Sequence, residues 1–550
     1  MGIPVVTISS EGQKLDPTVG LVSVEIQREL NRIPGAKLVL LDGSAAMRTF
    51  ALSNTAFFEP GKRIEIALRH EGDNADTTVF EGLVVRHAVE PRAEGSTLRI
   101  ELKDPAFKLT RQRKSAVFRK TDDQAIRKLI EDASLKVGTL ATTEHEHGEL
   151  IQYYASDWDF IVSRADVQGL VVDAHRGAIS TYAIALGARG TLKIEYGLTD
   201  LYELELELDG GQQWAEVSSV GWDLPEQKLR APEQAKQPTF KVGNLDAQAI
   251  AKQLGGDTCA LQHSGALEQA ELKAWADARL LRSRFAFLRG RAVVGGNAAL
   301  APLDTVELSG VGDRFNGRAL VSAVIQRIDR DGWRTELQLG LSPEWFAHKP
   351  DIAEIPAAGL LPPVSNLQIA VVAAFEKDPR GEHRIKLTLP ALDAKDGVVW
   401  ARVARPDAGK DRGLVFWPEE NDEVVIGFLD GDPRQAIVLG ALHGSKKSPP
   451  GLAPEPSAAN DMRAIVSRAG SSIVFDDAKK TITIETAGKK AGEKKNRILI
   501  DGDEKAVTIV DAHGNSIVMN DKGITMKSTS DFIIDAGGMV TIKGKTVDVQ

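Results

Sequence analysis

One short stretch of the chain has residue types that suit a metal ion, Glu144-His-Glu-His-Gly148. Imidazole nitrogens and carboxylate oxygens are ordinary zinc ligands, and His145 and His147 would point to the same side of an extended strand. Zinc hydrolases, however, use His-Glu-x-x-His spacing, and no third ligand is visible nearby in the sequence. The sequence therefore predicts a solvated loop here, and no metal site.

Other motifs with possible chemistry are incomplete. Gly310-Val-Gly-Asp-Arg-Phe315 begins like a dinucleotide fingerprint, but phenylalanine occupies the third glycine position and strands flank it on both sides. Asp430-Gly-Asp432 and Asp501-Gly-Asp503 lack the remaining ligands of a calcium loop, so both predict turns. The basic cluster Arg111-Gln-Arg-Lys114 with Arg119-Lys120 predicts a solvated or inter-subunit face, with anion binding as the alternative.

No nucleophile elbow of the Gly-x-Ser-x-Gly type occurs, and Cys259 has no catalytic signature around it. The sequence thus predicts no catalytic residue, no cofactor and no enzyme activity. A net charge of −9 argues against a general nucleic-acid partner. The single cysteine excludes an internal disulfide framework.

The length of 550 residues suggests about three or four domains, and a hydrophobic content of 42% is enough for packed cores. The N-terminus has no basic and apolar regions of a secretory signal, and no apolar run is long enough to span a membrane. We therefore expect synthesis in the cytoplasm and, if the protein leaves the cell, another route of exit.

Residues 463–550 are organised as short apolar strands, rich in β-branched residues and separated by Gly, Asp, Asn and Lys. Part of the pattern repeats, because Gly470–Asp477 resembles Gly514–Asp521. The clearest expected strands are Ser472–Phe475, Thr481–Ile484, Arg497–Ile500, Val507–Val510, Ser516–Met519, Ile524–Met526, Phe532–Ile534, Val540–Ile542 and Val547–Val549.

Such short strands cannot bury a face alone, and an open sheet exposes its edges. Winding several identical chains together would pair each edge with a neighbour and bring Ile, Val and Met onto a common axis. About 10 strands at roughly 4.8 Å per rung would make a rod on the order of 50 Å long. The alternative is a β-sandwich, against which the lack of any long hydrophobic strand counts.

The first 352 residues mix strands with a few helices. Residues 121–124, Thr-Asp-Asp-Gln, form an expected N-terminal capping segment. Expected strands are Val19–Glu25, Ala36–Leu41, Ile64–Leu68, Thr78–Val85 and Thr97–Leu102, and expected helices are Asp122–Ala133, Asp157–Ala165, Leu245–Leu254 and Glu268–Phe285.

Two β regions in this part look duplicated. Pro60–Ile66 resembles Pro302–Leu308, and further on Phe80-Glu-Gly82 matches Phe315-Asn-Gly317. Each copy closes with a further strand. Matches in the same order predict two copies of one barrel-like module.

Proline-bearing linkers at 353–365 and 446–462 divide the chain into 1–352, 366–445 and 463–550. The middle part resembles the OB-fold of VgrG proteins, the spikes of type VI secretion and related contractile injection systems, a phage tail hub-spike family. The residues that carry this resemblance are Trp400-Ala-Arg-Val403, Pro418–Val424, Gly427-Phe-Leu-Asp-Gly-Asp-Pro433 and Ile437–Gly440.

The resemblance extends along the chain with small departures. Asn421 stands where the family usually has glycine, at a turn that asparagine tolerates. Upstream, Gln152–Ile161 resembles the family's segment that enters a hub helix, and Gly312–Gly317 resembles its second hub barrel.

The resemblance implies a mainly β fold with a few helices. Residues 1–352 would form a hub of two tube-protein-like β-barrel modules, 366–445 an OB-fold collar, and 463–550 a triple-stranded intertwined β-helix needle. Three chains would then present six similar modules to a six-fold tube. The implied function is the trimeric central spike of a contractile injection apparatus, which punctures the target membrane. The alternative is a phage-tail-like cell-wall hydrolase with an unrecognised active site.

The implied partners are two further copies of the chain, tube and baseplate proteins at the hub, an effector cargo and, transiently, the target membrane. The particle would be assembled in the bacterial cytoplasm without a signal peptide, and delivered or released extracellularly. Three copies of a final strand would leave a blunt face with unpaired backbone groups. The resemblance suggests that a PAAR-type tip protein covers it, bound by Thr546, Val547, Asp548, Val549 and Gln550.

Overall fold

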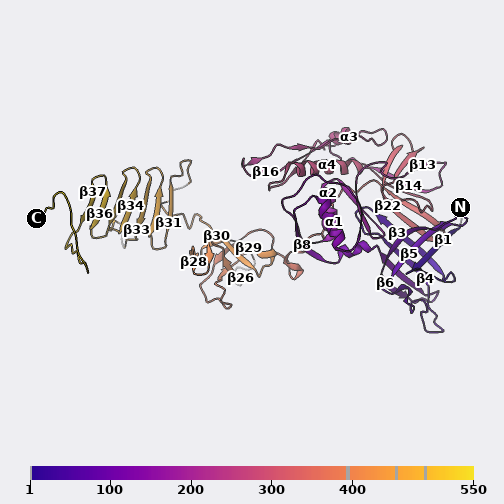
Figure 1. Cartoon of the computed structure of the whole chain (residues 1–550), viewed down its shortest axis with the longest axis horizontal. Helices are drawn as coiled ribbons and strands as arrows, with labels where there is room; N and C mark the ends of the chain where they lie inside the picture. Colours follow the sequence, from indigo (N-terminus) through magenta and orange to yellow (C-terminus); the bar gives the residue numbers. More distant parts are fainter. Residues whose placement is uncertain (1–2, 392–396, 453–455, 489–491, 550) are drawn as a thin grey trace. The chain divides into compact units, whose positions relative to one another are not determined.

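The computed structural model describes residues 3–391, 397–452, 456–488 and 492–549 (Figure 1). The chain divides into two compact units, Met1–Ile355 and Pro356–Gln550, and the division lies inside the 353–365 linker segment. Strands far outnumber helices in both units. Among the described residues, no helix combines the length and the apolar character that crossing a membrane requires.

The first unit begins with a module of six principal strands whose spatial order is β1-β5-β6-β7-β4-β3. Alternating side chains point into its core, so Leu98, Ile100 and Leu102 of β7 are all buried. The strands are β1 (Pro4–Ser10), β3 (Leu21–Glu29), β4 (Gly35–Leu41), β5 (Arg63–His70), β6 (Thr77–Glu90) and β7 (Thr97–Lys103), with the short β2 (Gln13–Lys14) beside β1.

A second module repeats this order as β13-β21-β22-β23-β20-β14. Its strands are β13 (Thr191–Glu195), β14 (Leu201–Leu208), β20 (Leu288–Gly295), β21 (Thr305–Ser309), β22 (Gly317–Asp329) and β23 (Gly332–Leu339). One difference is that β1 runs antiparallel to β5, whereas β13 runs parallel to β21. The strand order confirms the duplication expected from the sequence.

The register of the duplication differs from the one that the sequence motifs indicate. Both long strands carry a bulge, between Val84 and Arg86 in β6 and between Val321 and Ala323 in β22. The bulges align Val84 with Val321, whereas the Phe-x-Gly match would align it with Ala319, two residues away. Pairing geometry sets the register, and turn residues that resemble each other by type do not.

The two modules do not form separate closed barrels. They are parts of one thirteen-stranded sheet, joined where β22 pairs with β3. Separate hydrophobic cores nevertheless fill them, one around Leu38 and Phe58 and the other around Val306 and Leu337.

All four expected helices are present, as α1 (Asp122–Asp132), α2 (Asp157–Val167), α3 (Ala247–Gln253) and α4 (Gln269–Phe285). Thr121 is the N-cap of α1, but its hydroxyl donates to the Asp123 side chain and does not cap the backbone. The accompanying short strands are β8 (Arg113–Phe118), β9 (Lys136–Leu140), β10 (Leu150–Ser156), β11 (Leu170–His175), β12 (Ala178–Ala183), β15 (Glu216–Val220), β16 (Trp222–Asp223), β17 (Lys228–Leu229), β18 (Glu233–Gln234) and β19 (Thr258–Gln262).

The second unit contains a closed five-stranded barrel of the OB type, in the order β24-β25-β26-β30-β29. Asn421 has a φ of +64°, which explains why only glycine or a residue such as asparagine suits this turn. Asp430 also has a positive φ, in the turn expected at Asp430-Gly-Asp432. The strands are β24 (Gln368–Val372), β25 (Ile385–Thr388), β26 (Val398–Val403), β29 (Glu423–Phe428) and β30 (Ala436–Ala441), with β27 (Ala408–Gly409) and β28 (Arg412–Gly413) as a small hairpin.

The rest of this unit is a seven-stranded antiparallel sheet, which we call the needle sheet (Figure 1). Gly470 and Gly514 both have positive φ values before equivalent strands, which confirms the repeat seen in the sequence. Its strands are β31 (Met462–Val466), β32 (Ser472–Asp476), β33 (Thr481–Glu485), β34 (Arg497–Asp501), β35 (Ala506–Val510), β36 (Ser516–Asn520) and β37 (Gly523–Lys527).

Two expectations for this region need correction. Each needle strand pairs with its sequence neighbour, because short turns make local hairpins, so the inner strand edges need no second chain. The expected strands at 532–534, 540–542 and 547–549 are absent, since the last described strand ends at Lys527. A strand requires a partner, and among the described residues no further strand pairs with β37 on its far side.

Candidate assembly surfaces

One face of the needle sheet is a continuous apolar surface, which we call the needle face. Directly opposed residues form a first row, and residues two positions along each strand form a second row on the same face. The first row is Ile465, Ile473, Ile484, Ile498, Ile509, Ile517 and Met526, and the second is Phe475, Ile482, Ile500, Val507, Met519 and Ile524.

The needle face is only half covered by its own chain. Ile484 and Ile500 are each 41% exposed, and Met526 is 58% exposed. The central row of the opposite face is made of smaller and more polar residues, namely Ala464, Val474, Thr483, Leu499, Thr508, Val518 and Thr525. Leaving a contiguous apolar face of this extent in water is unfavourable.

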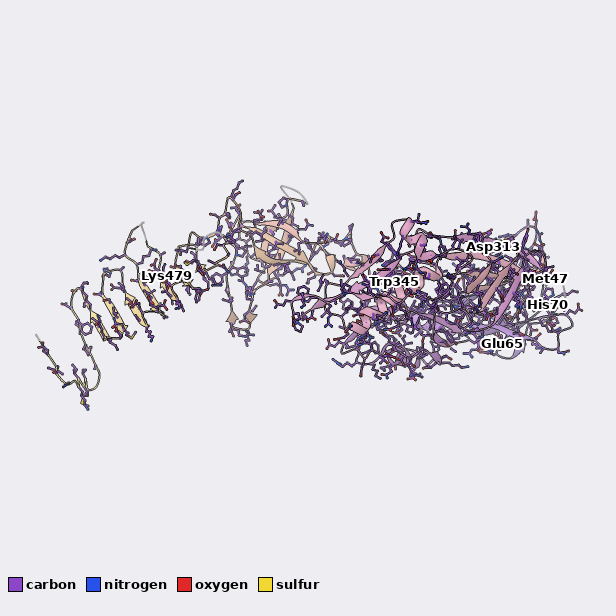
Figure 2. All side chains as sticks on the ribbon, turned by 90° about the horizontal axis from the view of Figure 1, so that it is seen from above. Met47, Glu65, His70, Asp313, Trp345 and Lys479 are labelled. Carbon is purple, nitrogen blue, oxygen red and sulfur yellow. The ribbon has the colours of Figure 1, made fainter. Side chains whose placement is uncertain are left out.

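Charged residues occupy the turns at the rim of the needle sheet. Lys479, labelled in Figure 2, lies in the turn after β32 and contacts Asp476 at 3.0 Å. Lys480 contacts Asp503 at 2.6 Å in the neighbouring turns. Exposed pairs of this kind contribute little to stability, so the free energy of this element depends on covering its apolar face.

The tail after β37 contains the residues that the sequence assigned to tip binding. Thr546, Val547, Asp548 and Val549 are exposed, and Gln550 lies outside the described residues. The expectation that they end flush with a final strand is wrong for the single chain, because no strand forms there. Large apolar side chains are exposed along this tail, namely Phe532, Ile533, Ile534, Met539, Val540 and Ile542.

The thirteen-stranded sheet, which we call the hub sheet, has two strand edges that pair with no described strand. They are the counterparts of the two edges, of β22 and β3, that pair with each other inside the chain. Residues Ala323–Ile328 of β22 pair with β23 on one side and with β3 on the other. In the part of the chain that the structure describes, the equivalent segment Arg86–Glu90 of β6 pairs with β7 alone. Likewise β14, the counterpart of β3, pairs with β20 alone.

The exposed fractions of the side chains agree with β6 and β14 each lacking a neighbouring strand on one side. Val24 and Ile26 are buried in the part of β3 that pairs with β22, whereas their counterparts Leu204 and Leu206 in β14 are half-buried. Val89 in the open part of β6 is 41% exposed. The two open edges therefore have the apolar character of strands that pair with another chain.

A buried charged network lies beneath the junction of the modules. Arg28 of β3 and Arg189 contact the Asp173 carboxylate of β11, at 2.7 and 2.9 Å. Nearby His175 is affected by this network. Burial and then the charge of Arg28 lower the pKa of His175 from 6.5 to about 4, so this imidazole is neutral at physiological pH.

The basic cluster expected at a solvated or inter-subunit face is partly engaged within the first unit. Lys114 contacts Asp157 at 2.6 Å, and Arg113 donates to the carbonyl oxygens of Asp351 and Ile352. These contacts are structural and do not form an anion site. The Gly310–Phe315 motif is a turn between β21 and β22, as expected.

The expectation of a solvated loop at Glu144–Gly148 is wrong for one of its histidines. His147 is buried, and its ring nitrogen Nε2 lies 3.1 Å from Asp122 Oδ2. The structure also brings Glu271 of α4 next to His145 and His147. Sequence reasoning missed this third residue because it lies far away along the chain, and no local spacing signals it.

Two family models match the chain. The Alg8 N-terminal domain matches residues 2–330, and the type VI secretion system/phage-baseplate injector OB domain matches residues 368–443. The first match covers more than half of the chain, and the second coincides with the closed barrel.

Relatives with assigned roles match over shorter stretches. Type VI secretion system spike protein VgrG5 of Pseudomonas aeruginosa is 32% identical over 128 residues, which are 22% of this chain and 15% of that protein. VgrG1a of the same organism is 30% identical over 78 residues, 14% of this chain and 12% of that protein. The chain thus matches only 12–15% of the length of these relatives.

Among solved structures, the half-lidded Francisella PdpA-VgrG complex is similar, with a TM-score of 0.42 at 9% identity. The match covers 96% of this chain and 88% of the other. The chain belongs to the Alg8 N-terminal domain family through residues 2–330, and the OB-domain model, the spike relatives and the closed barrel together identify it as a VgrG-type spike protein.

Proposed function

We propose that this protein is the central spike of a contractile injection apparatus, in which three copies form a hub, a collar and a puncturing needle. The observation that carries the proposal is the needle face. Two rows of large apolar side chains run the length of the needle sheet and are half exposed in the single chain. A rod-shaped element with one such face needs identical partners to cover it.

Three needle sheets related by a three-fold axis would turn their apolar faces inward and their charged turns outward. The second row then packs against the first row of the adjacent copies, and the smaller opposite face remains in water. Because short hairpins already pair the inner strands within each chain, the main stabilisation of the trimer comes from apolar burial. Pairing between chains is left for the tail beyond β37.

Three chains would close into a hub ring through the same kind of strand pairing that each chain already makes once within itself. In one chain, β22 of the second module pairs with β3 of the first. We place β6 of one chain against β14 of the next in the same way. In the β22–β3 pair, Gln326 lies opposite Ile26 and Val324 lies opposite Arg28. Replacing each residue by its counterpart in β6 or β14, as aligned by the bulges, puts Val89 opposite Leu206 and His87 opposite Leu208.

A hub closed in this way contains six similar modules around a three-fold axis. Internal pairing by β22 and β3 would alternate with pairing between chains by β6 and β14. Such a ring can match a six-fold tube on one side and a three-fold needle on the other. The partners implied are therefore a tube protein and baseplate proteins at the hub, with cargo carried by the assembled particle.

The tail after β37 fits the far end of the needle. Its exposed apolar side chains at Phe532, Ile534 and Ile542 would be buried by pairing among the three tails. We assign Thr546–Val549, together with the terminal glutamine, to binding of a PAAR-type tip protein. The role of the whole assembly is mechanical, and we assign it no catalytic step.

A cysteine pair tests the hub arrangement in the full-length protein. Val89→Cys and Leu206→Cys, combined in a Cys259→Ser background, should form a disulfide between chains and give covalent trimers under mild oxidation. Val117→Cys with Leu206→Cys is the control, since exposed Val117 lies on β8, outside the open edges. Native mass spectrometry measures the oligomer beforehand.

Two results would refute the proposal at different levels. A stable, folded monomer in native mass spectrometry would exclude the trimeric spike. If the protein is a trimer but the Val89–Leu206 pair cross-links no better than the control pair, the trimeric spike stands and the β6–β14 contact is wrong.

A further inference from the structure

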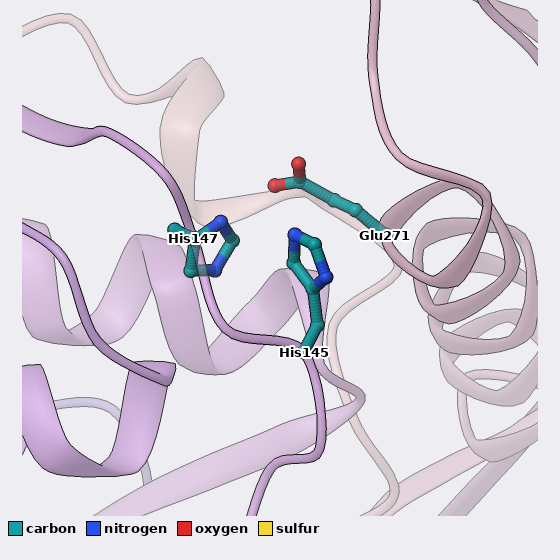
Figure 3. Close-up of side chains that lie close together, drawn as sticks. All are labelled: His145, His147 and Glu271. Carbon is teal, nitrogen blue, oxygen red and sulfur yellow. The ribbon is translucent and has the colours of Figure 1, made fainter.

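Two histidines and one glutamate from distant parts of the first unit converge on one point. His145 and His147 lie in the segment between β9 and β10, and Glu271 lies in the first turn of α4. Figure 3 shows one ring nitrogen of each histidine turned towards the Glu271 carboxylate. The potential ligand atoms of the three side chains all lie within 4.8 Å of one another.

The hydrogen bonds around the cluster leave a ligand atom available on two of these side chains. Nε2 of His147 lies 3.1 Å from Asp122 Oδ2 and 3.4 Å from Nη2 of Arg164, so both of these neighbours lie on the Nε2 side and Nδ1 is the ring nitrogen left for an ion. Arg164 donates to Oε1 of Glu271 at 2.9 Å, which leaves Oε2. A carboxylate that orients a ligating histidine from behind is the usual outer partner at a metal site.

The cluster is also held in place before any ion binds. The backbone N–H of His147 donates to the Lys120 carbonyl oxygen at 3.2 Å, and Glu146 forms a β-bridge with Thr121. Gln168 donates to the Asp122 carboxylate at 2.7 Å. The side chain of His147 is buried, while His145 is partly open to solvent. An ion can therefore enter from the His145 side without disturbing the core.

The charges of the cluster favour a cation. Asp122 and Glu271 are carboxylates, and the single guanidinium of Arg164 contacts both of them. With both imidazoles neutral, the formal charge of these five groups is −1, and a divalent ion changes it to +1.

We propose that His145, His147 and Glu271 bind a divalent first-row transition metal ion, with zinc as the best fit, and that the ion ties the 144–147 segment to α4. Two imidazoles, one carboxylate and a water molecule make an ordinary tetrahedral zinc set. Zinc–ligand bonds of about 2.0–2.1 Å place tetrahedral ligands about 3.4 Å apart. Side-chain rotations that move the ligand atoms by roughly an ångström bring them to that spacing.

Metal titration of the full-length protein tests this site. The protein is stripped with a chelator, dialysed, and titrated with Zn²⁺ in a calorimeter and with Co²⁺ in a visible spectrometer. We expect one ion per chain and the strong visible bands of tetrahedral Co²⁺. His145→Ala and Glu271→Gln should each weaken binding by at least about tenfold. Zn²⁺ should raise the melting temperature of the wild type and leave these variants unchanged.

Matched controls separate loss of a ligand from a general effect. His263→Ala and Glu144→Gln alter an exposed histidine and an exposed glutamate of the same unit, and both should bind metal like the wild type. The melting temperature of each metal-free variant shows whether it is folded. Absence of binding by the folded wild type at micromolar Zn²⁺, or unchanged binding by folded His145→Ala and Glu271→Gln, would overturn the proposal.

Discussion

The variant Ile484→Ala tests directly whether other chains cover the needle face. Ile484 belongs to the first row and is 41% exposed in the single chain. The substitution deletes three carbon atoms, each stabilising by about 0.8 kcal/mol when buried. If the sheet acted alone, the partial exposure would limit the loss to about 1.5 kcal/mol per chain.

In a trimer that buries the rest of this side chain, the loss is larger. A buried isoleucine replaced by alanine costs about 2–5 kcal/mol, because a cavity adds to the transfer free energy. Three symmetry-related sites would then sum to about 6–15 kcal/mol per trimer. The trimer should consequently dissociate at a clearly lower concentration of guanidinium chloride than the wild type.

The assay follows guanidinium unfolding of the full chain at several protein concentrations, with native mass spectrometry at each step. Thr483→Ala is the matched control, because it lies next to Ile484 on the same strand but points to the opposite face. We expect Thr483→Ala to leave the dissociation midpoint nearly unchanged. Losses that are equal for the two variants and independent of protein concentration would refute the covered needle face.

Two further predictions concern the hub and the tail. The folded protein holds His175 neutral, so between pH 6.5 and about 4 the unfolded chain binds a proton that the folded chain does not, and stability falls as the pH drops through this window. His175→Gln should make the free energy of unfolding in urea fall less steeply between pH 7 and 4, and an unchanged dependence on pH would contradict this prediction. Deletion of residues 547–550 should leave the trimer assembled but abolish co-purification of a tip protein, and unchanged co-purification would place the tip elsewhere.

Elements set by local pattern were predictable from the sequence. The bounds of helices α1 and α4 agree with expectation to within one residue, and in α1 the residues Ile126, Leu129 and Ile130, spaced for one helix face, are all buried. The strands from β32 to β37 were recognisable because β-branched runs alternate with turn residues. The OB barrel was identifiable from its turn motif, and the positive φ at Asn421 agrees with the turn expected there.

Features that depend on pairing were predicted less well. The duplication was visible, but its register was not, because bulges in β6 and β22 shift the alignment by two residues. The segments 532–534, 540–542 and 547–549 have residues suited to strands, but they pair with no strand in the described parts of the chain. Strand formation requires a neighbour, and sequence pattern alone does not reveal which neighbour is present.

The sequence by itself determined the types of most elements, the order of the modules and the resemblance to spike proteins, because these depend on residues close together in the chain. Only the tertiary structure decided which distant residues meet. It aligned thirteen apolar side chains into the two rows of the needle face. It also placed Glu271 beside His145 and His147. Such contacts arise from strand register and helix packing over long loops, and no local spacing encodes them.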